Sequence, residues 1–275
     1  MAEQIVLTAL DNVLLSSSEA AEPETAADTY ARLRPVLKRL QDLNVPVVVF
    51  SERDRTELAL ISQQLTLSDP FITESGSAIF TPVDHNPFTP ALGEKEDGYF
   101  VMALGCPYVQ ARAGLRVIAN VISHPLKGFG DFTVPQLQRA AALSEAAAHR
   151  AKAREFSEPF MTPKAVDPQV LQQAAEEMGF ELILRTAEES RFSELLGAGA
   201  GLGVAAKALL EAYRQQLAPN TGLKVLGLSD RAEDLSVLAT VSKQLGAEWT
   251  GVEVSGTDAW IEAIGVAYFG KNDYN

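Results

Sequence analysis

Four side chains that could do chemistry come directly after largely apolar runs of the sequence. Asp11 and Ser51 follow two such runs near the start of the chain, and Asp230 and Asp234 follow another near its end. Carboxylate oxygens are ligands that magnesium prefers, and a serine hydroxyl at a helix N-terminus can hold a phosphate group. The same residue types are also common helix caps. The pattern therefore leaves two interpretations open, a cation and phosphate site or a set of caps.

Composition narrows the classes of partner. The chain has 275 residues and a net charge of −13, which argues against nucleic acid, because phosphate backbones are bound mainly through Lys and Arg. The same charge favours solubility. An anionic substrate would need basic residues at its binding site, because the net negative charge of the chain repels it. A chain of this length can form a large core with a substantial insertion.

Cysteine usage and hydropathy indicate the compartment. The single cysteine, Cys106, rules out an intramolecular disulfide and suits a reducing cytosol. No apolar run approaches the roughly 20 residues needed to span a bilayer, and the N-terminus lacks the regions of a signal peptide. We therefore expect a cytoplasmic protein that does not associate with membranes.

The first part of the chain alternates between strand-like and helix-like segments. Residues 5–10, 45–50 and 70–80 have strand character, and residues 27–43 and 55–65 have helical spacing of their apolar positions. This strand–helix–strand–helix–strand order is typical of a parallel sheet with crossover helices. Such sheets bind ligands at the carboxyl ends of their strands.

The alternation changes near residue 82, which predicts an insertion. We expect a first core segment at 1–82, an inserted α+β segment at 83–190 and a second core segment at 191–275. The insertion should contain strands at 98–104 and 180–184 and helices at 108–122, 134–153 and 168–178. The second core segment should contain a helix at 205–216, a strand at 223–228 and a helix at 235–245.

Residues 5–15 resemble motif one of the haloacid dehalogenase superfamily of phosphohydrolases, Asp-x-Asp-Gly-Thr-Leu-Leu. Asp11 matches the second aspartate of that motif, and Ala9 stands where the nucleophilic aspartate belongs. The resemblance implies that Asp11 is a vestigial acid/base group. A methyl group at position 9 can neither attack phosphorus nor hold a cation.

Longer segments resemble one family within it, the mannosyl-3-phosphoglycerate phosphatases. Residues 70–80 are similar to its Pro-Phe-Ile-x-Glu-Asn-Gly-x-x-Ile pattern, and residues 126–133 and 154–160 resemble its two substrate-facing cap segments. This resemblance implies a doubly wound parallel α/β core with an inserted α+β cap of type two.

Other family positions depart from the pattern. The third motif normally supplies a lysine, and Leu202 stands there. The fourth motif keeps Asp230 and Asp234 but has Arg231 between them. With Ala9 and Leu202 both present, the phosphoryl site lacks its nucleophile and the lysine that offsets negative charge, and such losses commonly cost several orders of magnitude in rate.

The resemblance also implies the residues of a binding site. Ser51 would bind the phosphoryl group, and Asp11, Asp230 and Asp234 would bind magnesium weakly or not at all. The expected substrate-binding residues of the cap are Lys127, Asp131, Arg154, Glu155, Ser157, Glu158 and Arg191. For the cap segment 154–160, a purely structural role stays open.

Three hypotheses for function follow. The first is a catalytically impaired pseudoenzyme that binds a phosphorylated sugar-glycerate, or a protein partner, without turnover. The second is an active magnesium-dependent sugar-phosphate phosphatase of altered mechanism. The third is a structural or assembly protein that uses the fold as a scaffold, since fold alone does not fix function.

Overall fold

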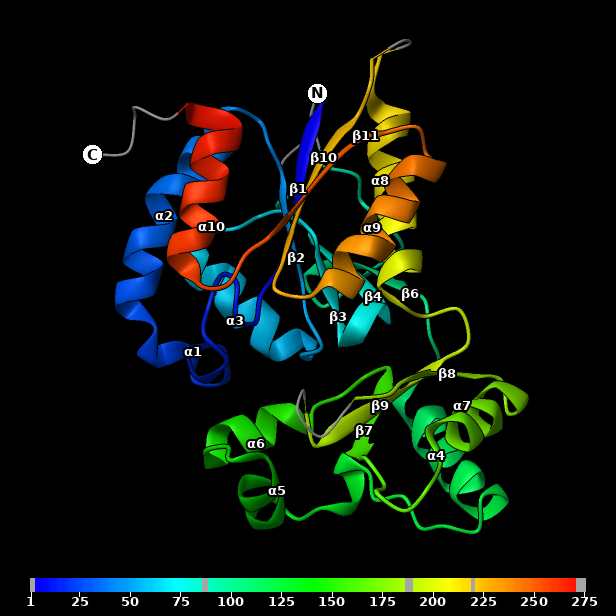
Figure 1. Cartoon of the computed structure of the whole chain (residues 1–275). Helices are drawn as coiled ribbons and strands as arrows, with labels where there is room; N and C mark the ends of the chain where they lie inside the picture. Colours follow the sequence, from blue (N-terminus) through cyan, green and yellow to red (C-terminus); the bar gives the residue numbers. More distant parts are fainter. Residues whose placement is uncertain (1–2, 86–88, 186–189, 219–220, 271–275) are drawn as a thin grey trace.

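The computed structural model describes residues 3–85, 89–185, 190–218 and 221–270 (Figure 1). It contains a mixed eight-stranded sheet and a separate three-stranded sheet. No helix in these residues is long and apolar enough to cross a membrane. The predicted fold class, an α/β core with a large parallel sheet, is confirmed.

The large sheet has the strand order β11-β10-β1-β2-β3-β4-β6-β5. Its first five strands pair in parallel and the last three pair antiparallel. The strands are β1 (Gln4–Ala9), β2 (Val47–Phe50), β3 (Phe71–Thr73), β4 (Ala78–Pro82), β5 (Glu94–Glu96), β6 (Tyr99–Ala103), β10 (Lys224–Ser229) and β11 (Glu248–Glu253). The central strands are almost completely buried, as expected for a sheet covered on both faces.

Helices cover both faces of this sheet. Figure 1 shows α2 and α10 on one side and α8 and α9 on the other. The elements are α1 (Ser17–Ala21), η1 (Pro23–Thr25), α2 (Ala27–Asp42), α3 (Arg55–Leu65), η2 (Glu74–Gly76), α8 (Leu202–Gln216), α9 (Ala232–Gln244), α10 (Thr257–Ile264) and η4 (Gly265–Phe269). In α2 the predicted apolar spacing places Tyr30, Leu33, Leu37 and Leu40 in the core. Each such side chain contributes about 1.5–3 kcal/mol when fully buried.

The small sheet is antiparallel, in the order β7-β9-β8, and carries helices on its outer side (Figure 1). Its elements are α4 (Tyr108–Val121), η3 (Phe129–Asp131), α5 (Val134–Ala141), α6 (Glu145–Ala151), β7 (Ser157–Met161), α7 (Pro168–Glu177), β8 (Phe180–Ile183) and β9 (Phe192–Gly197). Leu115 and Ile118 of α4 pack with Phe160, Leu171 and Leu195 in a second apolar core. This unit therefore has a core of its own, apart from that of the large sheet.

The structure differs from the predicted placement of two strands. The strand expected at 98–104 within the insertion is β6, and it pairs with β4 in the large sheet. β9, which was not predicted, begins at Phe192 yet lies in the small sheet. The chain thus leaves the large sheet after β6 and returns after β9. We propose a core with an inserted cap, in which the cap begins after β6 and ends with β9.

The single helix predicted at 134–153 is two helices. Ala142 adopts a left-handed conformation with φ of 55°, which ends α5. Ser144 then caps α6, where its side chain accepts a hydrogen bond from the backbone N–H of Ala147. The alanine-rich composition concealed this break, because alanine favours a helix throughout.

Candidate functional site

Two of the predicted site residues meet at the carboxyl edge of the parallel strands. β1 ends at Ala9 and β2 ends at Phe50, and the two strands are neighbours. The loops that follow bring the Ser51 hydroxyl to 2.8 Å from Asp11 Oδ2, to which it donates a hydrogen bond. The structure thus brings two of the predicted site residues, Asp11 and Ser51, into direct contact.

A cation that sequence reasoning missed occupies this edge. Arg53 donates from Nε and Nη2 to Asp11 Oδ1 at 2.9 and 2.7 Å, and its Nη1 lies 3.3 Å from Glu57 Oε2. Burial disfavours the charged guanidinium, but Asp11 and Glu57 more than offset this, so the pKa of Arg53 lies above its ordinary value. The sequence held one signal for this contact. Arg53 lies two residues after Ser51 and four before Glu57, a spacing at which oppositely charged side chains can pair.

The three acids predicted to bind magnesium are engaged in separate contacts. Both oxygens of Asp11 accept hydrogen bonds, from Ser51 and from Arg53. Asp230 accepts from the Asn12 amide at 3.1 Å, and Asp234 accepts from the Ser229 hydroxyl at 2.9 Å. Within the described ranges, no group of three or more His, Cys, Asp or Glu side chains could hold a metal ion. In this arrangement each of the three acids is bonded to a different side chain.

Position 202 brings an apolar side chain to the start of α8. Leu202 is half-buried and packs against the main core. The backbone N–H of Gly201, just before it, donates to the carbonyl of Gly76 at 3.1 Å. Gly76 has a φ of +93°, and a Cβ there would lie 2.2 Å from the carbonyl carbon of Gly201, so this close approach requires glycine.

Arg154, predicted to bind substrate, is enclosed between the unit of the large sheet and the unit of the small sheet. Its side chain is only 8% exposed, and Nη1 donates to the Glu52 carbonyl at 2.5 Å. The same nitrogen lies 3.4 Å from Glu194 Oε1 and 4.0 Å from Glu74 Oε2. The guanidinium is thus paired within the protein itself.

Neighbouring cap residues join the same junction. The Glu155 carboxylate pairs with Arg55 Nε at 2.8 Å. The backbone N–H of Glu155 donates a hydrogen bond to Glu74. Ser157 is fully buried, and its hydroxyl contacts Glu74. Three of the seven predicted cap residues therefore meet at a buried contact with the core.

The other predicted cap residues lie around or near the turn at 128–131. Glu158 is buried and accepts from the Gly130 N–H at 2.9 Å, and burial raises the pKa of its carboxyl group. Asp131 pairs with Arg112 at 2.9 Å. Lys127 is exposed, with Nζ 4.0 Å from the centre of the Phe132 ring. Arg191 is also exposed, beside the start of β9.

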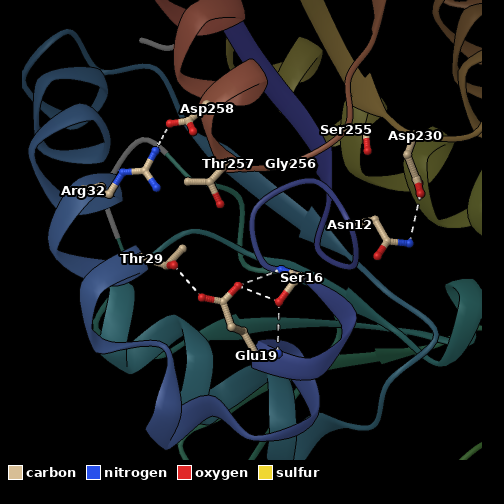
Figure 2. Close-up of a pocket in the computed structure, with 10 residues that line it drawn as sticks. All are labelled: Asn12, Ser16, Glu19, Thr29, Arg32, Asp230, Ser255, Gly256, Thr257 and Asp258. Atoms are coloured by element: carbon tan, nitrogen blue, oxygen red, sulfur yellow. Dashed lines mark hydrogen bonds and ion pairs between the residues drawn. The ribbon is translucent and has the colours of Figure 1, made fainter.

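A polar pocket of about 480 Å³ lies beside the motif-one loop (Figure 2). Asn12 and Asp230 border it, joined by their hydrogen bond, and Arg32 pairs with Asp258 on the opposite wall. The remaining lining residues are Ser16, Glu19, Thr29, Ser255, Gly256 and Thr257. Sequence reasoning did not select this pocket, because its walls come from three distant segments of the chain.

Comparison with known proteins places the chain in a superfamily. A glucosyl-3-phosphoglycerate/mannosyl-3-phosphoglycerate phosphatase of Persephonella marina is 28% identical over 239 residues, which cover 86% of this chain and 82% of that protein. A phosphatase of the same name from Methanococcoides burtonii is 29% identical over 247 residues, covering 87% and 82%. A haloacid dehalogenase-like hydrolase from Bacteroides thetaiotaomicron has the same fold, with a TM-score of 0.56 at 16% identity and coverage of 96% and 99%. The chain belongs to the haloacid dehalogenase superfamily.

No protein-family model matches the chain. The strand β1 itself ends in a residue that has no nucleophilic atom. β1 ends in Ala9, and the carboxylate that follows, Asp11, is bonded on both oxygens. The guanidinium of Arg53 pairs with this carboxylate at 2.7 Å.

Proposed function

We propose that this chain is a haloacid dehalogenase-superfamily protein that binds a phosphorylated sugar-glycerate ligand without hydrolysing it. The observation that carries the proposal is the closed contact of Asp11 with Ser51 and Arg53, next to Ala9. By the resemblance to motif one, a phosphorylated nucleophile and its cation would act at this end of β1.

Three features support the absence of turnover. Ala9 has no nucleophilic atom, Leu202 brings no cation, and Asp11 is held in an ion pair. Phosphoryl transfer depends on positioned charge around the transferred group. A protein that lacks this charge stabilises the transition state no better than the ground state, so it binds without turnover.

The ligand class rests on the two phosphatases to which the chain is similar, whose names state a sugar-3-phosphoglycerate. Lys127 and Arg191 are exposed cations of the cap and are the best candidates to meet an anionic ligand. Arg is suited to bidentate contact with phosphate or carboxylate. Arg154 belongs to the junction, so we assign it a structural role.

Calorimetry with mannosyl- and glucosyl-3-phosphoglycerate tests the proposal. We expect binding that weakens at least about tenfold in Arg191→Ala, because one charge-assisted contact contributes roughly 1.5–3 kcal/mol. Lys224→Ala is the matched control, since Lys224 is an exposed cation on β10 of the large sheet, outside the cap. The same samples should release no phosphate, with or without magnesium.

Two other outcomes would contradict the proposal in different ways. Magnesium-dependent phosphate release that is lost in Asp11→Asn would identify an active phosphatase of altered mechanism. Absence of both binding and release would favour the scaffold hypothesis or a protein partner.

A further inference from the structure

Two buried glutamates meet where the unit of the small sheet contacts the unit of the large sheet. Glu74 belongs to η2 and is fully buried, and Glu194 belongs to β9 and is 6% exposed. Ser157 of β7 lies between them. A buried carboxylate is costly unless hydrogen bonds or an opposite charge compensate for its lost hydration. We therefore expect each carboxyl oxygen at this contact to have a hydrogen-bond partner.

Glu74 accepts hydrogen bonds from three backbone N–H groups. Its Oε1 accepts from the backbone N–H of Glu155 at 2.9 Å. Its Oε2 accepts from the N–H groups of Phe156 and Ser157 at 3.1 and 2.8 Å. These three bonds fasten the first residue of β7 and the two residues before it directly to the core.

Ser157 cannot satisfy both glutamates as carboxylates. Its hydroxyl oxygen lies 2.6 Å from Glu74 Oε2 and 2.7 Å from Glu194 Oε1. A serine hydroxyl has one hydrogen to donate. If both acids were ionised, one of these two close contacts would join two oxygen atoms with no hydrogen between them.

One added proton completes the chain. A protonated Glu194 donates from Oε1 to Ser157, and Ser157 then donates to Glu74. The remaining oxygen of Glu194 accepts from the Ser75 hydroxyl at 2.5 Å. Every carboxyl oxygen of the pair then has a hydrogen-bond partner.

The charges around Glu194 lead to the same protonation state. Arg154 is the cation at the contact, 3.4 Å from Glu194 and 4.0 Å from Glu74. The acids Asp54, Glu57 and Glu52 add negative field from the adjoining part of the core, although Glu52 also pairs with Arg185 and Arg231. One guanidinium between two glutamates is balanced when one of them is neutral. Burial, only partly offset by Arg154, raises the pKa of Glu194 to about 7.

We propose that a proton held between Glu194 and Ser157 latches the unit of the small sheet onto the core, and that loss of this proton loosens the contact. The device is independent of whether a ligand binds. Its direction follows from linkage: a group whose pKa is raised in the closed contact favours that contact at low pH. The latch is therefore tight in mild acid and loosens as the pH rises through neutrality.

Amide hydrogen exchange of Phe156 and Ser157 measures the latch, because both N–H groups donate to Glu74. After correction for the intrinsic effect of pH on exchange, we expect about tenfold greater protection at pH 6 than at pH 8.5. Equal protection at the two pH values in the unmodified chain would overturn the proposal, with no need of any variant.

Two variants separate the latch from general effects of pH. In Glu194→Gln the side-chain amide can donate to Ser157 permanently, so protection should stay at its pH 6 value throughout. Asp69→Asn is the matched control, because Asp69 is another buried acid with a raised pKa, and its hydrogen bonds join it to Val47 and Thr89 and not to the Glu194 contact. This control should keep the full pH response. A Glu194→Gln variant that loses protection with pH as the parent does would refute the role of Glu194.

Discussion

Arg53 is the residue that most changes the chemistry of the strand ends. It joins Asp11, which follows β1, to Glu57 on α3. Removing the guanidinium takes this cation from both carboxylates. Glu57 is only 3% exposed, and it would keep its contact with Arg150 Nε at 3.5 Å. A fully buried pair costs about 3–5 kcal/mol when one partner is removed, and the partial exposure of Asp11 lowers this cost.

We therefore expect Arg53→Met to lower the free energy of unfolding by about 2 kcal/mol in urea denaturation. Lys38→Met is the control, because Lys38 pairs with Asp42 on the exposed surface of α2. Such a surface pair contributes well under about 1 kcal/mol. Equal effects of the two substitutions would show that the Arg53 contact is not structural.

Magnesium provides a second test at this scale. Because Asp11 is bonded on both oxygens, magnesium would have to break the contact with Arg53 before it could bind. A ligand stabilises the folded state only above its dissociation constant. We expect 10 mM magnesium chloride to raise Tm no more than sodium chloride of equal ionic strength. A rise of several degrees that disappears in Asp230→Ala would contradict this expectation.

Among the elements, those with a strong internal pattern could be predicted from the sequence. α3 was predicted at 55–65 and has these bounds, because its apolar spacing and the capping residue Asp54 both mark it. β11 was missed, since its residues are mostly exposed and show no apolar run. β9 was missed because it buries the polar residues Ser193 and Glu194, which interrupt an apolar pattern. Polar residues that are buried by tertiary contacts leave little trace in a single sequence.

The break between α5 and α6 leads to a prediction for Ala142. Its left-handed conformation, with φ of 55°, costs free energy for any residue with a Cβ. Glycine adopts this conformation readily and is the usual residue after a helix C-terminus. Ala142→Gly should raise the free energy of unfolding by about 0.5–1 kcal/mol. Ala141→Gly, one residue earlier inside α5, should lower it by a similar amount.

The candidate site shows the same limit of sequence reasoning. Asp11 and Ser51 could be placed together because parallel strand ends share one edge. Arg154 was expected to face a ligand, but its partners Glu74 and Glu194 come from segments 80 residues before it and 40 after it. Sequence analysis singled out Asp11, Ser51 and Arg154 but not the side chains that pair with Arg154.

At the scale of the whole molecule, buried acids determine how stability depends on pH. Burial raises the pKa of Glu57 and Glu194 to about 7 and that of Asp69 to about 6. In the unfolded chain these groups regain their ordinary values near 4. Between these values the folded state holds more protons than the unfolded state. Stability therefore falls as the pH rises through this window.

We expect the free energy of unfolding to be roughly 2–5 kcal/mol lower at pH 8 than at pH 5, measured by urea denaturation. Asp131 has a lowered pKa and acts in the opposite direction, but only in more acidic solution, below this range. The net charge of −13 adds to the effect, because self-repulsion grows as acids ionise. Glu57→Gln should remove part of the slope without touching the contact of Glu194 with Ser157. A stability that is constant or rises between pH 5 and pH 8 would mean that these acids are already ionised in the folded protein, and that their arginine partners outweigh the cost of burial.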